Sequence, residues 1–499
     1  MNNQIQATPL SIDDVTVIDD EKVKKAVTAA ALGNAMEWFD FGVYGFVAYA
    51  LGQVFFPGAS PGVQMIAALA TFSVPFLVRP LGGLFFGAMG DKFGRQKVLS
   101  ITIIIMAVST FCIGLIPSYA SIGIWAPILL LLAKLAQGFS VGGEYSGAAI
   151  FVAEYSPDRK RGFMGSWLDF GSIAGFVLGA GVVVLISSIV GEANFLDWGW
   201  RIPFFIAAPL GLIGLYLRHA LEETPAFQQH VEKMEKDDRS AIENPPKTSF
   251  KEIASKHWKS LLVCVGIVIS TNVTYYMLLT YMPSYLSHNL HYSEDHGVLI
   301  IIAIMIGMLF VQPVIGLTSD RIGRKPFIIG GSIGLLALAI PCFILINSNV
   351  IGLIFVGLLV LAVLLNSFTG VMASILPAMF PTHIRYSALA ISFNISVLVA
   401  GATPTVAAWL VESTGNLYMP AYYLMVVAVI GLITGLYMKE TANKPLRGAT
   451  PAASDRAEAK ELLQETYDNI EQKVEDINAQ IAELEKKKQT LIDQHPKLD

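Results

Sequence analysis

The chain has 499 residues, of which 54% are hydrophobic and only 15% are charged. Because a soluble globular protein carries about 25% charged residues, this composition excludes an ordinary soluble domain and indicates a protein embedded in a lipid bilayer. The formal net charge of −5 averages an almost uncharged core with charged tails, so it says little about partners. We expect no nucleic-acid partner.

Long runs with few charges predict twelve membrane-spanning helices, because each crossing needs roughly 20 apolar residues. The expected spans are residues 26–52, 63–90, 98–117, 123–153, 164–189, 201–217, 259–286, 297–318, 327–346, 350–379, 386–411 and 419–438. We therefore predict an all-α integral membrane protein with twelve transmembrane helices in two six-helix halves, followed by a C-terminal coiled-coil helix.

The expected organisation has six segments. They are a cytoplasmic N-terminal segment at 1–25, a six-helix bundle at 26–217, a cytoplasmic linker at 218–258, a second six-helix bundle at 259–438, a linker at 439–455 and a cytoplasmic coiled coil at 456–494. The first segment is polar and contains no apolar run, so we expect no cleaved signal peptide.

Basic residues are distributed unevenly over the predicted loops. The loops at 91–97, 154–163 and 319–326 carry Lys and Arg, whereas the predicted loops on the opposite side contain neither. By the positive-inside rule, this asymmetry predicts that both termini lie in the cytoplasm.

A charged hinge occurs twice, once in each predicted half. Gly87-Ala-Met-Gly-Asp91-Lys-Phe-Gly94-Arg95 recurs as Gly316-Leu-Thr-Ser-Asp320-Arg-Ile-Gly323-Arg324, and a weaker repeat follows the fourth and tenth spans. The carboxylates could cap neighbouring helix N-termini and pair with arginines as an inner latch; a static charged turn that fixes topology is the alternative. The predicted gate residues are Asp91, Arg95, Glu154, Arg161, Asp320, Arg324 and Arg385.

A heptad pattern begins in the last segment. Apolar residues recur at alternating spacings of four and three, which is the a/d seam of a coiled coil over about four heptads. The predicted seam comprises Tyr467, Ile470, Val474, Ile477, Ile481, Leu484, Lys488 and Leu491. A lone helix would expose this stripe, so we expect a homodimer; a helix packed on the protein or the membrane is the alternative.

The ionisable residues inside the predicted spans belong to the first half. They are Glu37, Asp40, Arg79, Lys134, Glu144 and Asp169. Ionised groups near a bilayer centre are costly and usually line a cavity or form pairs. At this depth the second half supplies neutral polar groups: Asn272, Thr274, Tyr275, Tyr276, Gln312, Asn366 and Asn394. We predict that the first half carries proton coupling and that the second supplies hydrogen bonds and aromatic surface to a substrate.

The strongest predicted pair joins the first span to the fourth. Glu37 and Lys134 each lie roughly a dozen residues from one end of their span, which places both near the midplane. A carboxylate beside a cation binds a proton more readily once the cation leaves. We therefore predict that Glu37 or Asp40 pairs with Lys134 in proton coupling; a permanent pair that holds the two spans together is the alternative.

Aromatic residues accompany these charges. Phe41 and Tyr44 follow Glu37 by four and seven residues, so they share its helix face, and the other candidates are Trp38, Tyr275 and Tyr276. Aromatic faces attract quaternary ammonium groups, and a nearby cation holds a carboxylate. The set therefore suits a small zwitterion, with packing or interface anchoring as the alternative.

The duplicated hinge and three further motifs resemble the major facilitator superfamily, and within it the metabolite:proton symporter group. The motifs are Asn34-Ala-Met-Glu37-Trp38-Phe-Asp40-Phe, Arg79-Pro-Leu-Gly-Gly83 and Gln137-Gly-Phe-Ser-Val-Gly-Gly143-Glu144-Tyr-Ser-Gly147. With the C-terminal heptads, the chain is similar to the osmosensory transporters of that group.

This resemblance implies a proton-coupled symporter of the bacterial inner membrane that imports zwitterionic osmolytes such as proline and glycine betaine by alternating access and is activated by hyperosmotic stress. It also implies a carboxylate–cation pair between the first and fourth spans, with Lys134 here in place of Arg. We expect no enzymatic activity, no metal and no cofactor beyond the proton gradient. The alternatives are a proton symporter for an organic acid such as α-ketoglutarate and a non-transporting membrane sensor or scaffold.

Overall fold

The structure, a computed structural model, describes residues 11–12, 15–58, 61–93, 95–219, 255–286, 290 and 294–494. Two units are described separately below. Glu21–Ala449 form a helical bundle, and Met1–Asp20 together with Thr450–Asp499 form a second unit. Most of the predicted linker at 218–258 lies outside the described residues.

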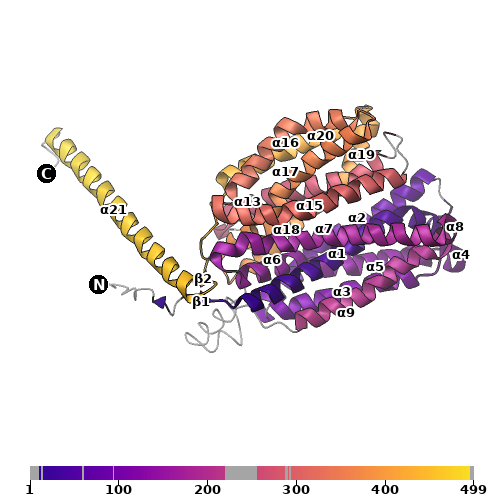
Figure 1. The fold of residues 1–499 in the computed structure, drawn as a ribbon, viewed down its shortest axis with the longest axis horizontal. Coiled ribbons are helices and arrows are strands. Elements are labelled where there is room, and N and C mark those ends of the chain that lie inside the picture. Colours follow the sequence, from indigo (N-terminus) through magenta and orange to yellow (C-terminus); the bar gives the residue numbers. More distant parts are fainter. Residues whose placement is uncertain are drawn as a thin grey trace. The chain divides into compact units, whose positions relative to one another are not determined.

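The first half of the bundle is built from long helices that run side by side (Figure 1). Its helices are α1 (Asp20–Phe55), α2 (Pro61–Phe93), α3 (Arg95–Leu115), α4 (Tyr119–Ile122), α5 (Trp125–Val141), α6 (Glu144–Tyr155), α7 (Arg161–Val190), α8 (Glu192–Asp197) and α9 (Ile202–His219), with 3₁₀ turns η2 (Asp158–Lys160) and η3 (Gly199–Arg201).

The second half repeats this arrangement. Its helices are α13 (Trp258–Tyr275), the π-helix η4 (Tyr276–Tyr281), α14 (Met282–Ser284), α15 (Glu294–Ile322), α16 (Lys325–Ile346), α17 (Ile351–Ala378), α18 (Arg385–Ala400), α19 (Thr403–Thr414) and α20 (Met419–Tyr437).

Many helices of the bundle are long and apolar enough to cross a membrane. Within the described ranges, nine helical segments are long and apolar enough to cross a membrane, and two shorter apolar segments lie in α3 and α9. Together with α1, which carries Glu37 and Asp40, these segments occupy the positions of the expected spans. The bundle is therefore the all-α, two-half architecture that the sequence predicts.

Three expected spans are interrupted where the sequence predicts continuous helices. α5 ends at Val141 and α6 begins at Glu144, α13 continues into the π-helix η4, and α18 and α19 are separate. At the first interruption only glycine fits, since a Cβ on Gly142 would lie 2.5 Å from the backbone nitrogen of Gly83 in α2. π-Helical turns occur frequently at functional sites, and η4 begins at Tyr276, one of the predicted site residues.

Small residues bring α1 and α7 into backbone contact. A Cβ on Gly175 would overlap the carbonyl group of Ala35, and one on Gly179 would lie 2.7 Å from the carbonyl oxygen of Phe39. Glycine stripes of this kind let membrane helices approach closely. The contact holds the part of α1 that carries the acidic residues of the site.

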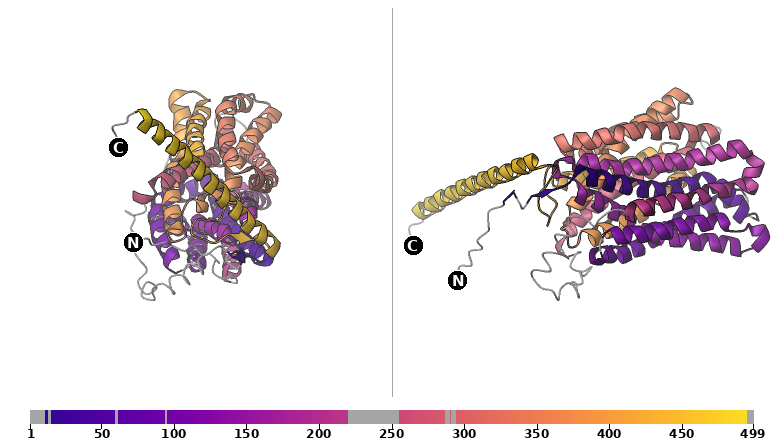
Figure 2. Two further views of the ribbon diagram at one scale, coloured as in Figure 1. Left: turned by 90° about the vertical axis from the view of Figure 1, so that its left-hand side faces the viewer. Right: turned by 60° about the horizontal axis from the view of Figure 1, so that its bottom comes forward.

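The two halves meet along two related helix pairs. α7 of the first half packs against α15 of the second, and α2 packs against α18. The first pair runs side by side in the views of Figures 1 and 2. α2 and α15 are the helices that end in the duplicated hinges, and we call this end of the bundle the hinge end.

The second unit joins both ends of the chain. β1 (Thr16–Val17) pairs in parallel with β2 (Ala452–Ala453). A small apolar cluster of Val15, Ala453, Ala459 and Leu462 packs around this ladder.

The predicted coiled-coil segment is one helix, α21 (Arg456–Gln494). Four of its seam residues are largely exposed: Val474 (51%), Ile477 (55%), Ile481 (48%) and Leu484 (64%). The side chains of Ile470 and Leu491 lie outside the described set. The apolar stripe predicted from the heptads is therefore open along the middle of the helix.

Candidate functional site

The first buried charge pair joins α1 to α2. Arg79 Nη2 donates a hydrogen bond to Glu37 Oε1 over 3.0 Å, and the two side chains are 3% and 1% exposed. The guanidinium also faces two aromatic rings, 5.9 Å from the centroid of Phe41 and 5.6 Å from that of Phe76. Stacking on aromatic faces suits a guanidinium because it is less strongly hydrated than an ammonium group.

A second buried network centres on Asp40. Its Oδ2 atom accepts hydrogen bonds from Thr110 Oγ1 in α3 and from Gln137 Nε2 in α5, the latter over 2.6 Å. Lys134 Nζ donates to Gln137 Oε1 over 2.5 Å and lies 4.2 Å from the ring centroid of Tyr44. Asp40 therefore reaches Lys134 through the amide of Gln137.

These contacts favour Asp40 over Glu37 as the predicted partner of Lys134, because Asp40 and Lys134 interact electrostatically and both bond to the amide of Gln137. Glu37 is bonded to Arg79, and Gln137 stands between Asp40 and Lys134. The sequence argument matched membrane depth alone, and depth does not decide which side chains meet across three helices. It assigned no role to Gln137, although a residue three positions after Lys134 shares its helix face.

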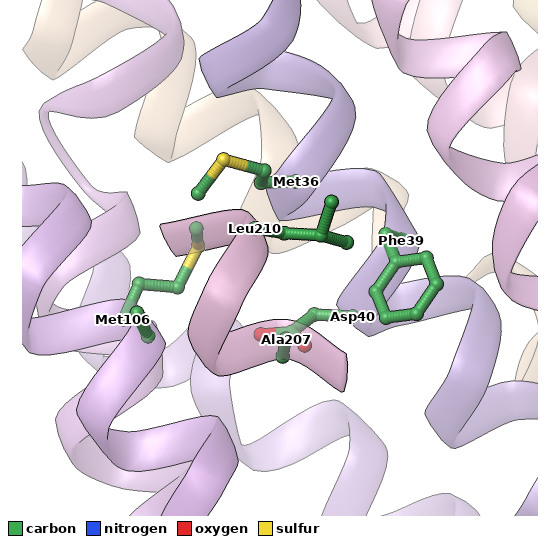
Figure 3. Close-up of a pocket in the computed structure, with 7 residues that line it drawn as sticks. Met36, Phe39, Asp40, Met106, Ala207 and Leu210 are labelled. Atoms are coloured by element: carbon green, nitrogen blue, oxygen red, sulfur yellow. The ribbon is translucent and has the colours of Figure 1, made fainter. Parts of the chain in front are cut away.

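A small pocket lies beside Asp40 within the first half (Figure 3). Its lining residues are Met36, Phe39, Asp40, Met106, Ala107, Ala207 and Leu210, from α1, α3 and α9. Asp40 Oδ1 is buried and has no hydrogen-bond partner in the described part of the chain. One carboxylate oxygen is thus engaged by the network, while the other can accept a proton.

An aromatic cluster lies where α1 and α2 meet α13 and η4. The ring centroid of Trp38 is 4.7 Å from that of Tyr275 and 6.2 Å from that of Tyr276, and Phe76 is 5.7 Å from Tyr276. Three buried donors at this cluster, Trp38 Nε1, Tyr275 Oη and Arg79 Nε, have no acceptor among the described atoms. Buried donors normally have acceptors, so these three atoms are available to donate to a bound ligand.

Asp169 occupies another part of this interface. The Tyr145 hydroxyl donates to Asp169 Oδ2 over 3.0 Å, and the Tyr145 ring stacks on Phe393 of α18 with centroids 4.5 Å apart. Asp169 also interacts electrostatically with Tyr275. Tyr145 therefore links the Asp169 carboxyl group of the first half to Phe393 of the second.

The remaining predicted site residues have structural contacts. Asn394 Nδ2 donates to the carbonyl oxygen of Gly142 over 2.5 Å, which ties α18 to the interruption between α5 and α6. Glu144, the first residue of α6, is fully buried. Asn272 donates to the carbonyl oxygen of Val268 one turn earlier in its own helix, over 3.1 Å.

At the hinge end, Asp320 caps a helix of the other half. Its Oδ1 accepts from the backbone nitrogen of Gly162 over 2.7 Å, and its Oδ2 accepts from that of Phe163 over 2.8 Å, at the N-terminus of α7. A carboxylate is favoured there by the helix dipole and the free N–H groups. Arg324 Nη2 approaches Asp320 Oδ1 at 3.5 Å.

A buried ion pair also crosses between the halves. Arg385 Nη1 lies 2.6 Å from Glu154 Oε1, and both side chains are fully buried. Arg161 pairs instead with Asp158 within its own half. Asp91 and Arg95 lie in the backbones of α2 and α3, and their side chains are outside the described set.

The residues after α20 form a strap over the hinge end, and we call Lys439–Ala449 the tail strap. Arg161 Nη1 donates to the carbonyl oxygen of Lys444 over 2.9 Å, and Arg385 Nη2 donates to that of Arg447 over 2.8 Å. The strap therefore contacts one hinge arginine of each half, although the sequence treats this stretch as a linker.

Glu440 anchors the tail strap to the start of α16. Its Oε2 accepts from the backbone nitrogens of Arg324 and Lys325, each over 3.0 Å, and its Oε1 accepts from those of Thr441 and Ala442, each over 2.8 Å. Burial alone would raise the pKa of this carboxyl group, but the four N–H donors outweigh burial and leave the pKa below its ordinary value.

The fold, the buried charges and the duplicated hinge define a membrane transporter of the major facilitator superfamily. Residues 26–452 match the family of sugar (and other) transporters, and residues 454–499 match the osmosensory transporter coiled coil. The chain belongs to the sugar (and other) transporter family; it is a multi-pass membrane transporter and not an enzyme.

Two relatives match almost the whole chain. It is 80% identical over 491 residues to the proline/betaine transporter of Salmonella typhimurium and 79% identical over 491 residues to the glycine betaine/proline/ectoine/pipecolic acid transporter OusA of Dickeya dadantii, with 98% of each chain covered in both cases. A structure of the proton:xylose symporter XylE bound to 6-bromo-6-deoxy-D-glucose shares the fold, with a TM-score of 0.73 and 20% identity over 86% of this chain and 98% of that one.

Proposed function

We propose that this chain is a proton-coupled symporter that imports small zwitterionic osmolytes, such as proline and glycine betaine, by alternating access. The names of the relatives that are about 80% identical support this substrate class. The observation that carries the proposal is the position of two buried charged groups, Glu37–Arg79 and Asp40–Gln137–Lys134, beside aromatic residues of both halves.

Asp40 is the proton carrier in this proposal. Its free Oδ1 atom can take up a proton while Oδ2 keeps its bonds to Thr110 and Gln137. An ionised Asp40 attracts Lys134 through the intervening amide, and protonation removes that attraction. The ammonium group of Lys134 is then released to follow the movement of α5.

The hinge end faces the cytoplasm in this proposal, and both termini lie on that side of the bacterial inner membrane. The basic loops support this orientation. The contacts of Asp320 with α7 and of Arg385 with Glu154 hold the hinge end closed. They must separate for the substrate to leave on the cytoplasmic side. The proton gradient supplies the driving force, without a cofactor.

The C-terminal helix is proposed to form a homodimer and to serve osmotic activation. Its exposed seam includes Val474, Ile477 and Ile481, and a partner helix would cover these side chains. The match of residues 454–499 to the osmosensory transporter coiled coil supports this role.

Uptake by purified protein in liposomes tests the proposal. With an imposed proton gradient and high external osmolality, labelled proline and glycine betaine should accumulate, and a protonophore should abolish this accumulation. The variant Asp40→Asn should exchange substrate across the membrane without proton-driven accumulation. Absence of uptake of both substrates at high osmolality would overturn the proposal, and accumulation of α-ketoglutarate instead would assign the chain to the organic-acid symporters.

A further inference from the structure

The aromatic cluster has hydrogen-bond donors without acceptors on one side. Arg79 uses Nη2 to bind Glu37, but its Nε is buried without an acceptor. The Trp38 indole N–H and the Tyr275 hydroxyl likewise lack acceptors in the described residues. A carboxylate offers about four acceptor sites on two oxygens, so the carboxylate end of a substrate could satisfy these donors.

Asp169 provides a buried carboxyl group near the same aromatic residues. It is 5% exposed and accepts hydrogen bonds from the Tyr145 hydroxyl. Among the described residues, no Lys or Arg forms an ion pair with it. A buried carboxylate with a single neutral donor is costly, and a cation brought by the substrate would remove that cost.

Aromatic rings connect the two charged groups. Trp38 lies 4.7 Å from Tyr275 and 6.3 Å from Phe176, measured between ring centroids. Phe176 follows Asp169 by seven residues on α7, which places the ring and the carboxylate on one helix face. Tyr275 contacts Trp38 and interacts electrostatically with Asp169. Aromatic faces stabilise a cation that is desolvated beside them.

From this arrangement we infer that Asp169 is a specificity-determining residue that receives the cationic end of the substrate, while Arg79 receives its carboxylate. Tyr145 is a positioning residue, because its hydroxyl orients the Asp169 carboxylate and its ring rests on Phe393. The inference rests on the proposed function and deepens it. The site then selects for molecules with both charges and disfavours anions of the same shape.

Glycine betaine has an isosteric anion that tests this selection. In 3,3-dimethylbutanoate, a quaternary carbon replaces the quaternary nitrogen, so the carboxylate and the shape remain while the positive charge is lost. Against wild-type protein in liposomes, this anion should inhibit betaine uptake at least about tenfold more weakly than unlabelled betaine does, because Asp169 attracts the cation and repels the anion.

The variant Asp169→Asn should raise KM for betaine about tenfold and bring the inhibition constants of betaine and 3,3-dimethylbutanoate close together. Asp169→Glu should restore part of the preference, and Tyr145→Phe should reduce it less than Asp169→Asn. An Asp169→Asn variant that keeps the wild-type preference would overturn the inference.

The same preference can be measured by binding if a variant does not transport. Displacement of labelled betaine from detergent-solubilised protein then gives both affinities. Failure of the proposed function has a different signature, since wild-type protein would then neither bind nor take up betaine. If Asp169 had a purely structural role, its substitution would lower the affinities for both ligands by the same factor. The ratio of the two affinities would then stay at its wild-type value, which would also overturn the inference.

Discussion

The two halves of the bundle share a fold and differ in what they bury. In the first half, α1, α2, α5 and α7 bury Glu37, Arg79, Asp40, Lys134 and Asp169 between their helices. In the second half, the buried charges Asp320, Arg324 and Arg385 lie at the hinge end, and neutral groups such as Asn366 occupy the interior. A duplicated scaffold can therefore bury charged groups in the interior of one copy and neutral polar and aromatic groups in the interior of the other.

The largest effect is expected from the cation of the first half. Lys134→Ala would leave the buried Asp40 network without its positive charge. Removing one member of a buried charged group costs about 3–5 kcal/mol, which favours a protonated Asp40 strongly enough to abolish proton-driven accumulation. Uptake in liposomes with and without a proton gradient measures this loss.

A buried serine of the second half serves as the control. Ser332 donates to a carbonyl oxygen of its own helix over 2.7 Å, so Ser332→Ala should leave the accumulation ratio unchanged. If Lys134→Ala accumulated substrate as wild type does, the buried charges that distinguish the first half would not serve proton coupling.

The ion pair between the halves should have the next largest effect. Glu154→Gln would leave the buried Arg385 without its carboxylate partner and destabilise the closed hinge end by about 3 kcal/mol. Spin labels at Lys160 and His383, which are exposed and lie on opposite halves, should show a broader and longer distance distribution. Asp158→Asn, in a pair confined to one half, should lower the thermal stability without changing this distance.

The tail strap should contribute less to the stability of the bundle, and its contribution should depend on pH. The lowered pKa of Glu440 means that its stabilisation is present above the ordinary value of 4.5 and is lost as the pH falls through the lowered folded-state value. Glu440→Gln should cost about 1 kcal/mol at pH 7, because the group is partly exposed.

Thermal unfolding at several pH values measures this contribution. The difference in melting temperature between wild type and Glu440→Gln should shrink as the pH falls below 4.5. Glu483→Gln, in an exposed pair with Lys487 on α21, should show no difference at any pH. If the difference in melting temperature between wild type and Glu440→Gln were the same at every pH, the stabilisation by Glu440 would not depend on the charge of its carboxylate.

The smallest effect on the bundle is expected from the C-terminal helix. Ile481→Pro should break α21 at a cost of about 3 kcal/mol to the helix, reduce dimerisation and shift the osmolality at which uptake begins. Cross-linking and an uptake curve against osmolality measure both changes, while the maximal uptake rate should stay near wild type. Ile481→Leu retains the apolar seam and should behave as wild type. If Ile481→Pro left the curve of uptake against osmolality unchanged, the helix would not be needed for osmotic activation.

Several features of this molecule can be read from local sequence. Apolar runs place the helices, because a lipid interior accepts little else. The heptads predict α21, since an apolar period of about 3.5 residues can be read from a single stretch of the chain. The uneven distribution of buried charges is also visible, because each of Glu37, Asp40 and Lys134 interrupts an apolar run.

The partners of those charges depend on three dimensions. Depth in the membrane constrains one coordinate of Glu37 and Lys134, whereas the packing of α1 against α2 and α5 decides that Glu37 meets Arg79. Gln137 opens one of the motifs in the sequence, but its bridging role could not be read there, because an amide carries no charge and occurs in many contexts. The tail strap reads as a polar linker, since its contacts with Arg161 and Arg385 are made by backbone carbonyl oxygens, which every residue has.

The sequence by itself therefore determined the transporter architecture, the duplicated hinge and the half that carries the charges. These follow from hydrophobicity, repetition and residue type, which are local properties of the chain. The tertiary structure decided that Gln137 bridges Asp40 and Lys134, that Tyr145 links Asp169 to Phe393, and that the tail strap contacts both halves. Such contacts join residues from different helices, so helix rotation and packing select them.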